Sequence, residues 1–139
     1  IISYFNETRF AEGGSMSNFT SNTDYKGEIL RENEIKNKYN IFGTSIDSLI
    51  QNNILRVPNY IKIDVDGIEH LILSGGTKAL SKVDEILIEV DEKFKTQVEK
   101  VSSILSLSGL KLSGKYQSLM MHRANKKNKT FNQVWKRNI

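Results

Sequence analysis

Three acidic side chains follow a short run of β-branched residues in the middle of the chain. Residues 60–65 have the composition of a buried strand, and Asp64, Asp66 and Glu69 lie at its end or just beyond it. In a parallel α/β sheet, the carboxyl ends of the strands open into a crevice where ligands bind. The spacing therefore predicts carboxylates at the rim of such a crevice, where they can bind a cation, accept a hydrogen bond or take up a proton.

The three acidic residues differ in how well a structural role explains them. A carboxylate at the end of a buried strand, such as Asp64, loses hydration, and a ligand, a cation or the nearby Lys62 must offset that cost. A helical pattern begins near Gly67, so Asp66 is placed to cap that helix and Glu69 to complete an Asp-x-x-Glu capping box. The alternative for Asp66 and Glu69 is a ligand-binding role.

A further acidic residue, Glu89, lies near the end of the next predicted strand, 85–90. If the two strands are neighbours in a parallel sheet, Glu89 lies beside Asp64. Two adjacent carboxylates raise each other's pKa, and a raised pKa suits a general base. The alternative is a solvent-facing side chain that pairs with Lys93.

Metal-binding motifs are not found in the sequence. The run Asp-Val-Asp-Gly resembles a calcium loop, but an EF-hand with Gly67 at its sixth position would have Lys62 and Leu73 at its first and last ligand positions. His70 and His122 lack the spacing of metal ligands. We expect His70 on a helix surface and His122 facing the site, and no metal centre.

The composition describes one soluble domain. The 139 residues, 38% of them hydrophobic, suffice for a single core. The lack of cysteine, of a signal peptide and of an apolar run long enough to span a membrane predicts a cytoplasmic protein. The net charge of +4 arises from the segment after residue 122, which is rich in lysine and arginine and has no acidic residue. We interpret it as a solvated strand edge, with no nucleic-acid partner.

The elements that must position the acidic residues alternate between strand and helix. This alternation predicts an α/β fold with a doubly wound sheet and a closing antiparallel hairpin. The polar stretch 6–38 is expected to be a long loop, with a possible helix at 29–36. Thr44 is expected to cap the first main helix. Strand patterns occupy 1–5, 39–43, 60–65, 85–90, 110–112, 116–122 and 131–137, and helical patterns occupy 46–50, 68–79 and 94–105.

Several parts of the sequence resemble the FkbM-type methyltransferases, which are S-adenosylmethionine-dependent enzymes of the Rossmann-like class. The specific part is the motif Ile61-Lys62-Ile63-Asp64-Val65-Asp66-Gly67-x-Glu69, followed by Leu73-x-Gly75, Leu80 and Glu89. Supporting marks are Gly13-Gly14-Ser15 and Ser45-Ile46-Asp47-Ser48-Leu49. The family usually has glutamate where Asp66 stands.

The resemblance implies a fold and a domain arrangement. Residues 1–139 would form a single domain that is the C-terminal part of a Rossmann-like class I methyltransferase sheet, with mostly parallel strands and a C-terminal antiparallel hairpin. The family binds its cofactor through a glycine-rich loop after the first strand and an acidic residue after the second. Neither is found in this sequence, so the resemblance implies a domain truncated at its N-terminus.

The resemblance also implies a reaction, namely methyl transfer from S-adenosylmethionine to a hydroxyl group of a sugar or natural product. Asp64 is the first candidate for the base that removes the hydroxyl proton, and Glu89 is the second. The residues 13–17 would close over the site. The residues expected at the cofactor are Asp64, Asp66 and Gly67, and those expected at the acceptor are Glu69, Ser15 and His122.

Two other interpretations remain open on the sequence alone. One is a non-catalytic binding or assembly module, in which an exposed sheet edge pairs with a partner chain or with a second copy to form a homo-oligomer. The other is an α/β enzyme that uses the carboxylates to bind magnesium, although further Asp or Asn ligands at suitable spacing are missing.

Overall fold

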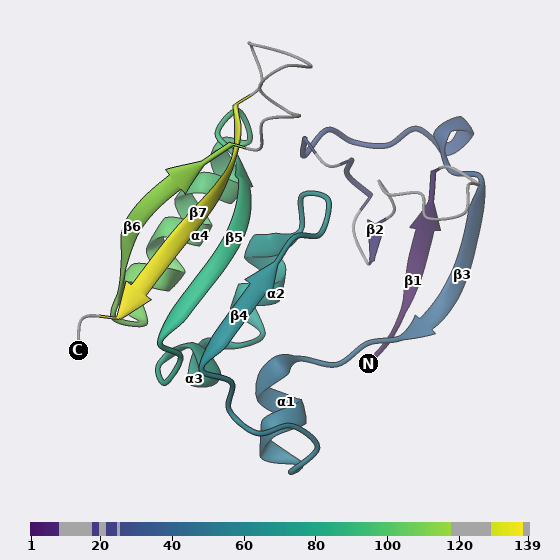
Figure 1. Cartoon of the computed structure of the whole chain (residues 1–139). Helices are drawn as coiled ribbons and strands as arrows, with labels where there is room; N and C mark the ends of the chain where they lie inside the picture. Colours follow the sequence, from purple (N-terminus) through teal and green to yellow (C-terminus); the bar gives the residue numbers. More distant parts are fainter. Residues whose placement is uncertain (9–17, 20–21, 25, 118–128, 138–139) are drawn as a thin grey trace.

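Two β-sheets make up the framework of the protein (Figure 1). The computed structural model describes residues 1–8, 18–19, 22–24, 26–117 and 129–137. The first sheet is antiparallel, in the order β2-β1-β3, and consists of β1 (Ile2–Glu7), β2 (Asn18–Phe19) and β3 (Asn37–Phe42). The second has the order β4-β5-β7-β6 and consists of β4 (Tyr60–Ile63), β5 (Glu85–Asp91), β6 (Leu110–Tyr116) and β7 (Thr130–Arg137).

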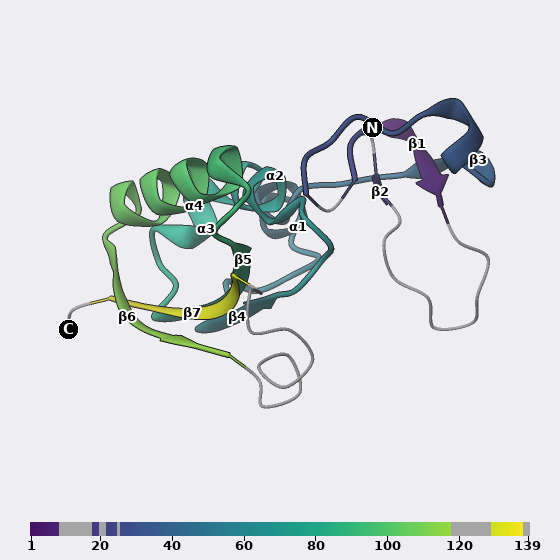
Figure 2. The ribbon, with the colours of Figure 1, turned by 90° about the horizontal axis from the view of Figure 1, so that it is seen from above.

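The helices are short except for one. They are the 3₁₀ turn η1 (Glu32–Glu34) and the helices α1 (Ile46–Gln51), α2 (Glu69–Ser74), α3 (Thr77–Leu80) and α4 (Lys95–Leu107). Figure 2 shows α2, α3 and α4 together on one face of the four-stranded sheet. With 13 residues in α4, none of the described helices has the length and apolar character needed to cross a membrane.

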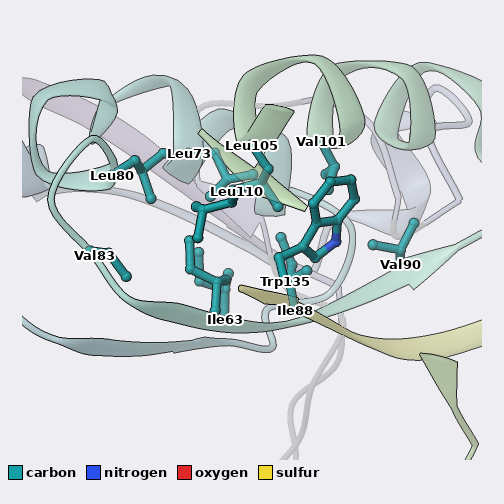
Figure 3. Packing of buried hydrophobic residues seen from close by; sticks show 11 residues of the cluster. Ile63, Leu73, Leu80, Val83, Ile88, Val90, Val101, Leu105, Leu110 and Trp135 are labelled. Atoms are coloured by element: carbon teal, nitrogen blue, oxygen red, sulfur yellow. The ribbon is translucent and has the colours of Figure 1, made fainter. Parts of the chain in front are cut away.

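The core lies between this helical layer and the sheet. Side chains alternate along β5, so Ile86, Ile88 and Val90 are fully buried while the residues between them point to the opposite face. Trp135 of β7 and Leu105 of α4 complete the packing (Figure 3). Burying a side chain of this kind stabilises the fold by roughly 1.5–3 kcal/mol. The strongest packing thus lies directly beneath β5.

The pairing of β4 with β5 determines where the acidic residues emerge. The two strands are parallel, and Ile63 lies opposite Ile88. On its other side β5 pairs with β7 in the antiparallel sense, and β7 pairs with β6 in the same way. The α/β class is confirmed, and the strands that the sequence predicted at 60–65, 85–90 and 131–137 are present. The expectation of mostly parallel strands is wrong, because among the described strands only β4 and β5 pair in parallel.

The predicted helix 68–79 is wrong as a single element, because it is divided into α2 and α3. Asp47 of α1 accepts hydrogen bonds from the backbone N–H groups of Lys78 and Ala79, and its own N–H donates to the carbonyl of Gly75. These bonds satisfy backbone groups at the break, so α3 can begin in a new direction. The expected cap at Thr44 is also wrong: Ser45 caps α1, and its Oγ accepts from the Ser48 N–H.

The described part of the polar stretch 6–38 contains more regular structure than the sequence predicts. Within its described part, β1 extends to Glu7, β3 begins at Asn37, and only the 3₁₀ turn η1 lies where a helix was expected. The predicted strand at 116–122 lies mostly outside the described residues. The predicted strand at 110–112 is longer than expected, because β6 continues to Tyr116.

Candidate functional site

Asp64 and Glu89 emerge side by side at the carboxyl ends of β4 and β5. Ile63 and Ile88 are paired and buried against the helices, so the residue that follows each of them points to the opposite face of the sheet. Glu89 is half-buried there, and Asp64 is exposed. Two carboxylates from neighbouring strands therefore share one rim.

Lys62 is part of the same rim. Its Nζ lies 2.7 Å from Oδ2 of Asp64, which is the ion pair that the sequence spacing allowed. The hydrogen bond and the charge of Asp64 raise the pKa of Lys62, and Glu89 adds a smaller contribution in the same direction. Lys62 therefore stays a cation and offsets the charge of Asp64.

The site changes the protonation of Glu89. Burial raises the pKa of Glu89 above its ordinary value, and repulsion by Asp64, Glu69 and Asp66 raises it further, while Lys62 lowers it. The direction agrees with the prediction for two adjacent strand-end carboxylates. Asn132 of β7, which lies opposite Glu89, brings a carboxamide to the same strand position; the sequence analysis did not single it out.

The loop that follows β4 has an unusual backbone. Asp66 has a φ of +25° and Gly67 a φ of +95°, and α2 begins only at Glu69. The prediction that Asp66 caps this helix is wrong, because the two positive-φ residues delay the helix and leave Ile68 at the N-cap position without a side-chain cap. Positive φ in a residue with a side chain is costly and is often found at ligand-binding loops.

Glu69 lies beneath this loop and not on the rim. It is 1% exposed, and its Oε1 accepts hydrogen bonds from the backbone N–H groups of Val65 and Gly67. Burial raises the pKa of Glu69, and these hydrogen bonds, together with one from Gln97, act in the opposite direction. The described structure thus engages Glu69 with the loop and with Gln97, and the capping box that the sequence predicted is not formed. The acceptor contact that the resemblance implies stays a prediction.

Gln97 is a buried polar residue that the sequence analysis missed. It is 2% exposed, its Nε2 donates to Oε2 of Glu69, and its Oε1 accepts from the Asp91 N–H at 2.8 Å. A signal was available, since Gln97 lies at helical spacing with the buried Val101 and Leu105. A polar residue at a core-facing position needs a hydrogen-bond partner.

The expected site residues Ser15 and His122 lie outside the described residues. His70 was expected on a helix surface, and that prediction is wrong. It is 6% exposed because α2 packs against α4, and its ring contacts the edge of Phe94 at 5.6 Å between centroids. Burial lowers the pKa of His70, and the charge of Lys100 lowers it further.

A cleft of about 410 Å³ adjoins the loop after β4. Its lining is mainly apolar and includes Ile68, Leu71 and Ile72 from the α2 region and Phe19 from β2, with the hydroxyl-bearing Thr44 among its polar residues. Ile68 follows Gly67 directly, so the cleft and the acidic rim share this loop. The size and composition are those of a small-molecule pocket. The sequence analysis did not identify this cleft.

The fold and the site define a class of protein: an α/β domain with carboxylates at the carboxyl ends of parallel strands, beside a positive-φ turn. The chain belongs to the methyltransferase FkbM domain family, whose family model matches residues 4–117. The family resemblance of the motif at 61–69 is thereby confirmed. Comparisons with curated proteins and with solved structures gave no significant match.

Proposed function

We propose that this chain provides the acidic rim of an S-adenosylmethionine-dependent O-methyltransferase that acts on a hydroxyl group of a sugar or natural product. The observation that carries the proposal is the convergence of Asp64 and Glu89 at the ends of two paired parallel strands. Membership of the methyltransferase FkbM domain family supports the general reaction class. The finer assignment follows from the chemistry of the rim.

The residues of the rim fit the charge of the cofactor. S-adenosylmethionine has a sulfonium, an ammonium and ribose hydroxyl groups, and when bound it supplies an electrophilic methyl group. Asp64 and Asp66 offer carboxylate oxygens to such cationic and hydroxyl groups. Gly67 has no side chain, and this lets a ligand approach the loop backbone closely. We therefore assign Asp64, Asp66 and Gly67 to cofactor binding.

Glu89 is the better base of the two candidates. Its pKa is raised by burial and by the neighbouring carboxylates, whereas Asp64 is held in an ion pair with Lys62. A base near neutral pKa removes a hydroxyl proton most effectively. In this assignment the carboxylate of Glu89 would take up the proton of the acceptor hydroxyl. The acceptor oxygen would form its bond to the methyl carbon as the bond from that carbon to the cofactor sulfur breaks, which leaves a neutral thioether. Lys62 and Asp64 orient the groups around it.

The glycine-rich cofactor loop of the family has no counterpart in this sequence. We propose that residues outside this sequence supply that loop. Among the described strands, β4 pairs only with β5, which leaves its other edge free for a further strand. Cofactor binding is therefore best measured on this chain and on a version extended at its N-terminus, side by side.

The test combines calorimetry with a methyl-transfer assay. The calorimetric probe is S-adenosylmethionine, and the assay follows labelled methyl groups into a panel of monosaccharides and polyols. Asp64→Asn should weaken cofactor binding by about tenfold or more, since a charge-assisted contact contributes on the order of 1.5–3 kcal/mol. Glu89→Gln should keep binding and reduce transfer by roughly 10²-fold or more.

Glu85→Gln is the matched control. Glu85 lies on the same strand and the same face as Glu89, but at the amino end, where it pairs with Lys136. The Glu85→Gln variant should change cofactor binding and methyl transfer less than twofold. If neither form of the chain binds S-adenosylmethionine, the methyltransferase assignment fails and a non-catalytic module becomes the better explanation.

A further inference from the structure

A continuous chain of buried and partly buried hydrogen bonds connects the ends of β4 and β5. The Asp91 N–H donates to Oε1 of Gln97, and Nε2 of Gln97 donates to Oε2 of Glu69. Oε1 of Glu69 then accepts from the N–H groups of Val65 at 3.2 Å and Gly67 at 3.3 Å. Val65 directly follows Asp64, and Asp91 lies two residues after Glu89.

We propose that Glu69 and Gln97 are positioning residues whose hydrogen bond sets the spacing between Asp64 and Glu89. This inference rests on the proposed function of Asp64 and Glu89. Both side chains of the pair are almost completely buried, so water does not compete for their bonds. The pair holds the backbone next to each reactive carboxylate and does not itself contact the ligand.

The backbone groups at both ends of this chain of hydrogen bonds determine which side-chain atoms must donate and which must accept. Asp91 presents an N–H group, so Gln97 must turn its oxygen toward it and its amide NH₂ toward Glu69. Val65 and Gly67 also present N–H groups, so position 69 must accept there. Glutamate at 69 and glutamine at 97 satisfy every one of these requirements.

Each isosteric single substitution breaks this match. In Glu69→Gln, the new amide uses its oxygen for the two loop N–H groups and turns its NH₂ against the NH₂ of Gln97, so two donors meet. In Gln97→Glu, the new carboxylate meets the carboxylate of Glu69, so two acceptors meet. A buried polar group without its partner costs on the order of 1–3 kcal/mol.

The double substitution Glu69→Gln with Gln97→Glu restores the match. The amide at 69 accepts from the two loop N–H groups and donates to the carboxylate at 97, which in turn accepts from the Asp91 N–H. The central bond is reversed, and all the others are kept. The buried charge stays within the pair but moves from α2 to α4.

The experiment is a double-mutant cycle read by two measurements on the full chain. Urea unfolding should show that each single variant lowers the folding equilibrium constant by about tenfold or more and that the double variant recovers most of the loss. Backbone NMR should show that the chemical shifts of Asp64 and Glu89 change in both single variants and return toward their native values in the double variant.

A matched control separates positioning from mere loss of stability. Val83→Ala removes buried volume just before the amino end of β5, away from the Glu69–Gln97 pair. Val83→Ala should lower stability without changing the backbone chemical shifts of Asp64 and Glu89. In the methyl-transfer assay, the single variants should lower kcat more than they raise KM, and the double variant should restore kcat.

The outcomes are distinct from those that test the reaction. A double variant no more stable than the less stable single variant would overturn the pairing, and so would backbone chemical shifts of Asp64 and Glu89 in Glu69→Gln that match those of Val83→Ala. If the single variants do not fold, a folded double variant supports the proposal and an unfolded one overturns it. The stability and NMR results decide the question even if no methyl transfer is observed.

Discussion

Nζ of Lys62 lies 2.7 Å from Oδ2 of Asp64. Lys62 therefore balances the charge of Asp64 directly, and it compensates the charge of Glu89 less. The difference arises from strand geometry. Lys62 and Asp64 are two residues apart along the same chain segment, whereas Glu89 comes from the neighbouring strand. The ion pair therefore distinguishes two otherwise similar side chains, with Asp64 paired to Lys62 and Glu89 placed to exchange a proton.

Removal of the lysine charge should change the titration of Glu89. In Lys62→Met, the pKa of Glu89 should rise further, because the native lysine lowers it. Carboxyl NMR across a pH series measures the shift. Lys136→Met is the control, since Lys136 pairs with Glu85 at the other end of β5. An unchanged Glu89 titration in Lys62→Met would contradict the rim geometry.

The raised pKa of Glu89 predicts a pH-dependent gain in stability for Glu89→Gln. Because the folded-state pKa lies above the ordinary value of 4.5, ionisation of Glu89 destabilises the folded state. The penalty is absent when the group is protonated in both states and grows as pH rises through the raised pKa. Urea unfolding should therefore show a larger advantage for Glu89→Gln over the native protein at pH 8 than at pH 4. Glu85→Gln should show no such trend.

His70 should make the native protein less stable in mild acid. Its pKa is lowered in the folded state, so the unfolded chain binds the proton more readily as pH falls through 6.5. The stability that depends on a neutral His70 is thus present above this pH and is lost below it. In His70→Leu this loss should disappear between pH 7 and the folded-state pKa. A parallel decline in both proteins, measured by urea unfolding, would assign the effect to other groups.

The turn after β4 should be sensitive to any side chain at Gly67. Its φ of +95° is unfavourable for alanine, so Gly67→Ala should destabilise the protein by about 1 kcal/mol or more and weaken cofactor binding. Gly76→Ala is the control, because its φ is negative and an added Cβ meets Ile46 only at ordinary contact distance. Equal losses in the two variants would show that the turn has no special requirement.

The main strands and the meeting of Asp64 with Glu89 could be predicted from the sequence. β-branched runs specify buried strands, and parallel neighbours end at the same edge of a sheet. The division of the helix after Gly75 could not be predicted, because it depends on hydrogen bonds that the Asp47 carboxylate accepts from backbone N–H groups about 30 positions later in the sequence. The Glu69–Gln97 bond is a contact of the same long-range kind. Local patterns assigned Glu69 to a capping box because they contain no information about its distant partner.

The position of β7 has a consequence for how the protein is made. β5 lies between β4 and β7, and β7 contains residues from close to the C-terminal end of the sequence. During synthesis, β5 leaves the ribosome roughly 40 residues before β7, the strand that completes its hydrogen bonding. We therefore expect a nascent chain to expose this edge of β5, including the position of Glu89 opposite Asn132, until residues 130–137 have left the ribosome.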